Sequence, residues 1–522
     1  MIELKLAHNK GFQWYESDGI FTKGKCITLS GEVLDGEKLC EYFRNIREET
    51  DFINRINELN GLYSIVILRE NKIMVAVDRL RNFPLFYQLK NGILKISDDY
   101  KFFIAESKAN IDEEAKNTML QLGYVAGNKT LTKDVFQLLG SQYLIFENQQ
   151  IKINFYYKIH PCKYNVSDRQ EWKKLFREKL SVVGERLSQM IGDNPVALPL
   201  SGGFDSRIIG LLLKLNHKKN VLCFSYGDPN NIEAKISKQV ADTLNYPWVF
   251  INYNPYTKTD YIHSKQFHDY IDFAGNAVSF PYIQEYFAAR YLKEELKLPE
   301  NTIFIPGHSG DTLGGSHLFP DMSYFRSPEI LAKKIIRTNG NLIPVNTKDK
   351  QELLRIISQS IEPEDTMITH LSHDHWNITE RQSKQTVNSS KVWNYFGYKY
   401  LLPLWDNDLT DLFASIPFEF RVYKNFYNET LAELFDENGI LFEQEISLNY
   451  SQKEKAYFKL RLKYLFPILS KLKKKNKVPH SFFYFEDLLQ PMLRELEPFD
   501  YYSGNGILSA WYIKNFRNNV RP

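Results

Sequence analysis

Residues 200–206, with the sequence LSGGFDS, have the residue types of a phosphate-binding loop. The two glycines lack a Cβ atom, so the chain can turn sharply and point backbone N–H groups at a ligand. The two serines add hydroxyl donors, and a helix that begins after the loop would direct the positive end of its dipole to the same place. Because a carboxylate repels phosphate, Asp205 fits this loop only if Mg²⁺ lies between them.

A second loop with one carboxylate follows another apolar segment. Residues 307–315 read GHSGDTLGG and come directly after the apolar segment 302–306. Open parallel sheets bind their ligands beyond the carboxyl ends of the strands. We therefore expect Asp311 in this loop and Asp205 in the first loop to share metal ions on a triphosphate.

Alternating strands and helices are expected to position both loops. Short apolar runs predict strands, and apolar residues at three- and four-residue steps predict helices. The predicted strands are residues 195–200, 221–226, 248–253 and 302–306, and the predicted helices are residues 169–192, 206–215 and 230–244. This alternation predicts a parallel sheet with right-handed crossovers.

The rest of the chain has two other patterns. Up to about residue 160, short apolar runs separated by turn signals predict hairpins, with helices at residues 37–47 and 112–122. From about residue 328 onward the pattern is mostly helical.

The composition excludes several classes of protein. The chain has 522 residues, of which 43% are hydrophobic and 25% charged, so it is not disordered, collagen-like or a coiled coil. A net charge of +3 is too small for a nucleic-acid coat or a polybasic membrane binder. Four scattered cysteines, Cys26, Cys40, Cys162 and Cys223, do not make a disulfide framework or a zinc site. Without a signal peptide or a long apolar run, we expect a soluble cytoplasmic protein with no membrane or nucleic-acid partner.

Several segments resemble one family, in the same order along the chain. Residues 200–206 resemble the pyrophosphate loop of ATP pyrophosphatases, which cleave ATP between the α- and β-phosphates. Residues 307–315 and 397–406 resemble segments of asparagine synthetases and their lactam-forming relatives. Residues 77–87 and 96–98 are similar to segments of class II glutaminase domains. The chain therefore resembles the family of asparagine synthetases, β-lactam synthetases and lasso-peptide cyclases.

The resemblance implies an α/β protein with two domains. Residues 1–160 would form an α+β glutaminase-like domain with stacked antiparallel sheets. Residues 166–522 would form an ATP pyrophosphatase domain with a parallel sheet and a large helical part. Possession of a glutaminase-like domain does not imply its activity, because class II glutaminases use an N-terminal cysteine and position 2 here is Ile2. The N-terminal domain is therefore predicted to be inactive.

The activity that the resemblance implies is ATP-dependent amide formation. A substrate carboxylate would attack the α-phosphorus of ATP, release pyrophosphate and give an acyl-adenylate, which an amine then converts into an amide. The cofactors would be ATP and Mg²⁺. The family also places a lysine near the α-phosphate, and Lys453 fits that context best, with Lys455 or Lys424 as alternatives. The nucleotide-binding residues implied by the family are Leu200, Ser201, Gly202, Gly203, Asp205, Ser206, Tyr226 and Gly307. The implied metal ligands are Asp205 and Asp311, and the implied catalytic residues are Asp205 and Lys453.

Other interpretations remain open or are set aside. Asparagine synthetases carry acidic residues where this chain has His308 and Thr312, which argues against aspartate as the substrate. An ammonia-dependent asparagine synthetase, a tRNA-modifying ATP pyrophosphatase and a non-catalytic scaffold are the alternatives. The partners would be a small-molecule or peptide carboxylate and an amine, and a homodimer is left open. The histidines of residues 370–375 are interpreted as the surface end of a helix, and the basic run 471–477 as a solvated face.

Overall fold

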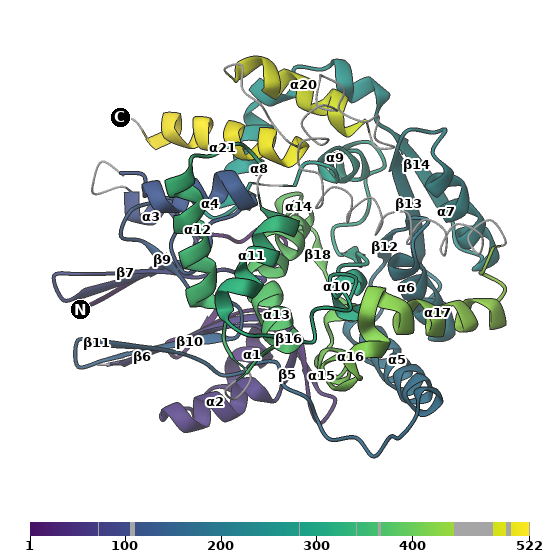
Figure 1. Cartoon of the computed structure of the whole chain (residues 1–522), viewed down its shortest axis with the longest axis horizontal. Coiled ribbons are helices and arrows are strands. Elements are labelled where there is room, and N and C mark those ends of the chain that lie inside the picture. The colour runs from purple at the N-terminus through teal and green to yellow at the C-terminus, as the bar shows by residue number, and fades with distance from the viewer. Residues whose placement is uncertain are drawn as a thin grey trace.

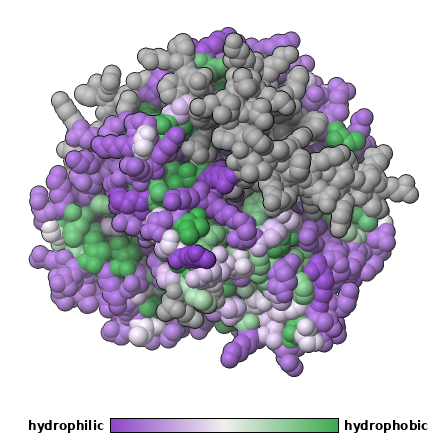
Figure 2. Space-filling view, in the orientation of Figure 1, coloured by the Kyte–Doolittle hydropathy of each residue, from purple (hydrophilic) through white to green (hydrophobic). Residues whose placement is uncertain are grey.

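The computed structural model describes residues 1–70, 72–104, 110–280, 282–340, 342–363, 367–442, 484–496 and 503–520. Two sheet systems stand side by side in it (Figure 1). The strands of the N-terminal part lie at the left of the view, a parallel sheet lies at the right, and helices fill the space between and above them. Figure 2 shows hydrophilic side chains over most of this face, with apolar patches among them. Among the described helices, none is both long and apolar enough to cross a bilayer.

The N-terminal part contains two sheets. The larger has the order β11-β10-β6-β5-β3-β2, with β4 also paired to β3, and the smaller has the order β1-β8-β7-β9. The strands are β1 (Ile2–Lys5), β2 (Tyr15–Ser17), β3 (Ile20–Thr28), β4 (Val33–Asp35), β5 (Leu59–Arg69), β6 (Lys72–Val77), β7 (Phe86–Lys90), β8 (Ile93–Ser97), β9 (Phe136–Gln137), β10 (Gln142–Glu147) and β11 (Gln150–Phe155). The hairpins predicted from the sequence are confirmed. The antiparallel sheets expected for this part are confirmed, with one exception: β1 pairs with β8 in parallel.

Alternation along β5 builds the layers of this part. Val66 packs toward the smaller sheet, in a cluster with Leu85 and Leu94. The neighbouring Ile65 and Ile67 face the other way, in a cluster with residues of the helices α1 and α2. Opposite orientation of successive side chains is what a strand requires, so one strand supplies both cores. The helices of this part are α1 (Gly36–Tyr42), α2 (Glu49–Asn57), α3 (Lys101–Ile104) and α4 (Glu113–Leu122).

The C-terminal part is built on a five-stranded parallel sheet with the order β14-β13-β12-β15-β18. Its strands are β12 (Val196–Pro199), β13 (Val221–Gly227), β14 (Trp248–Asn252), β15 (Ile303–Phe304) and β18 (Lys399–Tyr400). The first four of these are the strands predicted from the sequence. The chain moves outward from β12 through β13 to β14 and then returns to the other side of β12. This reversal puts a topological switch point between β12 and β15, where such sheets bind ligands.

Helices connect and cover the parallel sheet. The three that sequence periodicity predicts are α5 (Arg169–Ile191), α6 (Phe204–Leu215) and α7 (Ile232–Thr243). The remaining described elements follow in chain order: η1 (Asn254–Lys258), η2 (Tyr261–His263), α8 (Lys265–Gly275), α9 (Tyr286–Glu294), α10 (Gly310–Gly314), β16 (Tyr324–Phe325), α11 (Pro328–Asn339), α12 (Thr347–Ser360), β17 (Ile368–Thr369), α13 (His370–Asn377), η3 (Ile378–Thr386), η4 (Val387–Ser390), α14 (Lys391–Tyr395), η5 (Pro403–Trp405), α15 (Asn407–Ser415), α16 (Phe418–Arg421), η6 (Val422–Lys424), α17 (Asn425–Glu437), α20 (Phe485–Glu495) and α21 (Gly504–Val520).

The two parts share one hydrophobic core. The largest buried cluster contains Phe12 and Phe83 of the N-terminal part together with Tyr400 and Leu401 beside the parallel sheet. Phe12 contacts both Phe83 and Tyr400 with its ring. Burial of this kind makes the separation of the two parts unfavourable, because apolar area would return to water.

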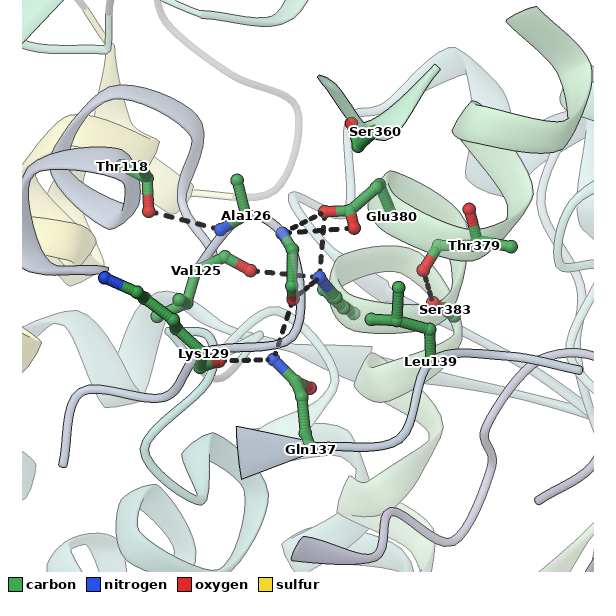
Figure 3. Close-up of polar contacts among 12 residues, drawn as sticks. Thr118, Val125, Ala126, Lys129, Gln137, Leu139, Ser360, Thr379, Glu380 and Ser383 are labelled. Carbon is green, nitrogen blue, oxygen red and sulfur yellow. Dashed lines mark hydrogen bonds and ion pairs between the residues drawn. The ribbon is translucent and has the colours of Figure 1, made fainter. Parts of the chain in front are cut away.

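A buried ion pair joins the two parts (Figure 3). Lys384 and Glu380 lie one turn apart in η3, with Nζ 2.8 Å from Oε2, and both side chains are almost fully buried. Lys384 Nζ also donates to the carbonyls of Val125 and Gly127, at 3.1 and 2.7 Å. Glu380 accepts from the backbone N–H of Gly127. The loop of the N-terminal part is thus fixed to η3 by charged groups that water does not reach.

Removal of one member of this pair is expected to destabilise the chain. In Lys384→Met, the buried Glu380 carboxylate loses its counter-charge, so we expect a loss of about 3–5 kcal/mol in the free energy of unfolding. Chemical denaturation followed by fluorescence measures this quantity. Lys238→Met is the matched control, since Lys238 pairs with Asp242 at the same spacing on the surface of α7 and should change stability by less than about 1 kcal/mol. Equal effects of the two substitutions would contradict this description of the contact.

Candidate active site

A cleft of about 350 Å³ lies beyond the carboxyl ends of β12, β13 and β15. This is the switch point of the sheet. The nucleotide-site and metal-site residues predicted from the sequence that line it are Leu200, Ser201, Gly203, Asp205, Ser206, Tyr226, Gly307 and Asp311. Gly202 lies behind the loop, where its carbonyl accepts a 2.6 Å hydrogen bond from Arg207 Nη2. Lys453 and Lys455 are outside the described residues.

The loop before α6 is organised by its own serines. The backbone N–H of Ser201 donates to Ser206 Oγ at 3.0 Å, and the N–H of Gly203 donates to Ser201 Oγ at 3.1 Å. Gly203 is the N-cap residue of α6, so no side chain caps the first turn of this helix. The first N–H groups of the helix, together with its dipole, form an anion-binding site.

The second loop approaches the first at van der Waals distance. A Cβ atom on Gly307 would lie 2.8 Å from the backbone nitrogen of Ser206, and a Cβ atom on Gly310 would lie 2.5 Å from Cγ of Asp205. Real Cβ atoms do not come so close to other heavy atoms. Glycine at position 307 therefore lets the loop approach the backbone of Ser206, and glycine at position 310 leaves room for the Asp205 side chain. The two glycines therefore allow Asp311, which follows Gly310, to lie close to the first loop.

One lysine bridges the two carboxylates. Lys424 Nζ lies 2.8 Å from Asp205 Oδ1 and 2.7 Å from Asp311 Oδ1. The Lys424 side chain is 8% exposed, whereas that of Asp311 is 73% exposed. Burial alone would lower the pKa of Lys424, but the two carboxylates raise it above its ordinary value. The ammonium group is therefore charged and holds both carboxylates around a single point.

The backbone before Lys424 is shaped to present this side chain. Tyr423 and Lys424 both have positive φ angles, 59° and 64°, so the chain kinks between α16 and α17. Arg421, just upstream, is buried and binds Asp374 through Nη1 at 2.7 Å. Asp374 also contacts His317 Nε2 at 2.6 Å. The kink is thus anchored to α13 by a buried charged network.

This network corrects the interpretation of residues 370–375 as a surface helix end. His373, Asp374 and His375 are buried. Burial alone would raise the pKa of Asp374, but Arg421 and His317 hold it below its ordinary value. Among the described residues, no group of three or more histidine, cysteine, aspartate or glutamate side chains is arranged to hold a metal ion. The segment supports the lysine kink instead.

The donor set around Lys424 fits Mg²⁺ in the presence of a nucleotide. Mg²⁺ prefers oxygen ligands and is commonly bound by one or two carboxylates together with substrate phosphates. Asp205 and Asp311 already converge on a cation, the Lys424 ammonium, and the adjacent start of α6 is suited to phosphate. The exposed carboxylate of Asp311 has room to rotate toward a metal ion.

The cleft is also lined by polar residues that the sequence analysis missed or did not assign. Glu285, which lies just before α9, lines the cleft together with Tyr226 and His308. His308 Nε2 lies 2.9 Å from Ser389 Oγ in η4. Burial lowers the pKa of His308 to about 4, so its ring is neutral at physiological pH. No sequence motif marks Glu285, because its neighbours Tyr282, Tyr286 and Phe287 are aromatic and its place in the cleft depends on tertiary packing.

Comparison with known proteins identifies the two parts. Residues 187–438 match the asparagine synthase family, and residues 35–157 match the glutamine amidotransferase domain. The chain carries an asparagine synthase domain and a glutamine amidotransferase domain. The resemblance drawn from the sequence is therefore confirmed.

Two curated relatives are similar to these domains. One is named "Putative asparagine synthetase (glutamine-hydrolyzing) 2", from Methanocaldococcus jannaschii, and is 24% identical over 63% of this chain and 66% of its own length. The other is the microcin J25-processing protein McjC of Escherichia coli, 22% identical over 46% of this chain and 44% of its own length. The chain thus spans less than two thirds of each relative that it matches.

Solved structures share weaker similarity. A glutamine phosphoribosylpyrophosphate amidotransferase from B. subtilis is 11% identical, with a TM-score of 0.19 over 57% of this chain and 63% of that chain. An NH₃-dependent NAD synthetase from Campylobacter jejuni is 16% identical, with a TM-score of 0.18 over 37% of this chain and 95% of that chain.

The approach of the two loops can be tested by adding one methyl group. In Gly310→Ala, the new Cβ atom collides with Asp205, so Asp311 must move away from the first loop. We expect the affinity for Mg²⁺-ATP, measured by calorimetry, to fall at least about tenfold, because a 1 Å displacement of one ligand weakens the site. Unchanged affinity with an unchanged melting temperature would show that nucleotide binding does not need this contact.

Proposed function

We propose that this protein is an ATP-dependent amide-forming ligase. It activates a substrate carboxylate as an acyl-adenylate, releases pyrophosphate and transfers the acyl group to an amine. The observation that carries the proposal is the meeting of Asp205 and Asp311 on Lys424, beside the uncapped start of α6. Membership of the asparagine synthase family supports an ATP-dependent ligase in general, and the specific reaction is our inference.

The phosphate loop would hold the β- and γ-phosphates. Ser201 and Ser206 line the cleft together with the first residues of α6. Their N–H and hydroxyl groups bind anionic oxygens without adding negative charge. Mg²⁺, when bound through Asp205 and Asp311, would neutralise charge that develops on the leaving pyrophosphate. Because these groups would hold the β- and γ-phosphates, the α-phosphorus would be left for the substrate carboxylate to attack.

Lys424 would act on the α-phosphate. Its ammonium group is charged, buried and held at the junction of the two loops. As the substrate carboxylate oxygen bonds to the α-phosphorus, the bond from this phosphorus to the bridging oxygen breaks and pyrophosphate leaves with the electron pair. A fixed cation at this place stabilises the extra charge without reorganisation. We therefore assign to Lys424 the role that sequence context gave first to Lys453.

The chain is proposed to lack a glutaminase of its own. Class II glutaminases need a cysteine whose own amine is free to act as base. Cys26 and Cys40, the thiols of the N-terminal part, lie inside β3 and α1, with a peptide bond on either side. Both are buried, and burial raises the pKa of both thiols. Ammonia or another amine would therefore reach the synthetase site from outside this domain.

The alternative functions are less well supported. Enzymes that insert sulfur into tRNA need a reactive thiol near the pyrophosphate loop, but Cys223 lies inside β13, and burial raises its pKa to about 12. A scaffold without activity would not need Asp205, Asp311 and Lys424 to converge. Ammonia-dependent asparagine synthesis remains a special case of the proposal, although the neutral His308 in the second loop does not favour aspartate as the acid.

Pyrophosphate exchange tests the adenylation step. Incubation with ATP, Mg²⁺, labelled pyrophosphate and a panel of acids (dicarboxylic amino acids, uronic acids and short peptides) should give acid-dependent label in ATP for at least one acid. Asp205→Asn and Asp311→Asn should each reduce exchange at least about a hundredfold, because each removes charge that stabilises the leaving group. Glu294→Gln, a change outside the cleft, is the control and should exchange normally.

The products formed from ATP provide a result that would contradict the proposed reaction. Formation of ADP and phosphate instead of AMP and pyrophosphate would exclude adenylation. Full exchange by Asp205→Asn would exclude the assigned site.

Glutamine hydrolysis tests the N-terminal domain. The purified chain should release no glutamate from glutamine, and ammonium chloride should replace glutamine fully as the nitrogen source. Cys26→Ala should behave like the wild type in both assays, because this thiol is buried in the sheet. Glutamate release that disappears in Cys26→Ala would show that the domain is an active glutaminase.

A further inference from the structure

Glu285 is a buried carboxyl group in the wall of the cleft. It is 9% exposed and lines the same cavity as Asp205 and the phosphate loop. The hydroxyl group of Tyr226 hydrogen-bonds to this carboxyl group. Within the described residues, its Oε2 atom has no hydrogen-bond partner. A buried carboxylate oxygen without a partner is unfavourable, so its retention next to a reaction site calls for a ligand that supplies a donor.

Among the described residues, no cation lies close enough to Glu285 to lower the pKa of its carboxyl group. The titratable groups that it influences are tyrosines from four different segments: Tyr226 of β13, Tyr253 after β14, Tyr270 of α8 and Tyr282. Arg381 of η3 affects the pKa of Tyr282, which it lowers, and is not among the groups that shift the pKa of Glu285. His308, elsewhere in the cleft wall, is buried and neutral. Burial raises the pKa of Glu285 to about 7, against the opposing effect of the hydrogen bonds from its own backbone and Tyr226.

Contacts with Tyr226 hold Glu285 in the wall of the cleft. Residues 276–280 contact the N-terminal part: the N–H of Val125 donates to the carbonyl of Val278, and the N–H of Phe280 donates to the carbonyl of Gly123. Tyr226, which holds Glu285, stacks on Tyr253 with ring centroids 5.1 Å apart. The stacked ring of Tyr226 thus holds Glu285 in the wall of the cleft.

We propose that Glu285 receives the amine substrate of the ligase. Oε2 accepts a hydrogen bond from the incoming ammonia or primary amine, which arrives as a cation and supplies the missing positive charge. The inference rests on the proposed function and deepens it, because it names the class of the acceptor substrate and the residue that binds it. A hydroxyl or thiol acceptor would not bring this charge.

The same contact moves the proton in the second half of the reaction. The amine nitrogen forms a bond to the acyl carbon of the adenylate, and the bond from this carbon to the phosphate oxygen breaks. AMP leaves with the electron pair of that bond. Before this attack the bound ammonium group gives one proton to Oε2 of Glu285, which frees the lone pair of the nitrogen. The second proton, released as the amide forms, leaves on the phosphate of AMP. Tyr226 keeps the carboxyl group oriented during the transfer to Oε2 and is a positioning residue.

Glu285→Gln separates the two half-reactions. This variant keeps the shape of the side chain and loses its charge and its proton-accepting oxygen. With an acid from the panel, pyrophosphate exchange should stay within about threefold of wild type, whereas amide formation from ammonium chloride or methylamine should fall about a hundredfold, a typical contribution of a general base. Hydroxylamine is largely unprotonated at neutral pH and should restore most of the rate. Glu294→Gln, at the other end of α9, should leave both half-reactions unchanged.

Thermal unfolding gives a second readout that needs no substrate. The carboxyl group of Glu285 binds its proton more tightly in the folded state than in the unfolded state, because its pKa is raised to about 7 on folding. The folded protein therefore loses stability as the pH rises from the ordinary pKa of glutamate through about 7. At pH 8, Glu285→Gln should therefore melt at a higher temperature than the wild type, and at pH 5 the difference should shrink. Lower melting at pH 8 would show that Glu285 already has a cationic partner and would overturn the proposal.

The outcomes distinguish this inference from the function on which it rests. Absence of exchange by the wild type with every acid of the panel would defeat the proposed function. Normal exchange by the wild type together with undiminished amide formation by Glu285→Gln would defeat only the role of Glu285. An equal loss of exchange and of amide formation in the variant would show that Glu285 serves the acid or ATP instead, and would also overturn it.

Discussion

The contact of Asp205 and Asp311 with the ammonium group of Lys424 is the constraint on which the rest of the site depends. Two carboxylates from different loops repel each other and come together only around positive charge. Three features of the chain make this meeting possible. The reversal of strand order places the two loops side by side, glycine at positions 307 and 310 lets them touch, and the kink at residues 423–424 brings the lysine from a third segment.

The N-terminal part contributes to this arrangement through structure. Its core is continuous with that of the parallel sheet, and the loop at Val125 and Gly127 is bound to η3 by the buried pair of Glu380 and Lys384. The π-helical η3 leads directly into η4, where Ser389 contacts His308 of the second loop. The glutamine amidotransferase domain therefore supports one wall of the cleft, and this structural contribution does not depend on glutamine hydrolysis.

Sequence patterns predicted what is determined locally. The strands β12 to β15, the helices α5 to α7 and the two glycine loops each carry their signal within about 25 residues, and the resemblance to a known family placed Asp205 and Asp311 together. These local patterns could not predict contacts between segments that are distant in the chain. Parallel pairing of β1 with β8 joins segments about 90 residues apart in the chain, and the burial of His373 and Asp374 depends on Arg421.

The same distinction explains the incomplete prediction of the site. Lys424 was one of three candidate lysines because its reach depends on two left-handed residues and on an anchor in α13, which leave no periodic trace in the sequence. Glu285 had no signal at all, since a carboxyl group among tyrosines becomes significant only when the path of the backbone turns it toward a cleft. Side chains that tertiary packing, and not a motif, brings to the cleft cannot be predicted from the sequence alone.

The most direct test of the central claim is a crystal structure of the chain with Mn²⁺ and α,β-methylene ATP. Anomalous scattering locates the metal ion, and the methylene bridge prevents cleavage at the α–β position. The account predicts Mn²⁺ within coordination distance of the carboxylates of both Asp205 and Asp311, with the phosphates at the start of α6. A nucleotide bound elsewhere, or a metal ion that touches neither carboxylate, would contradict it.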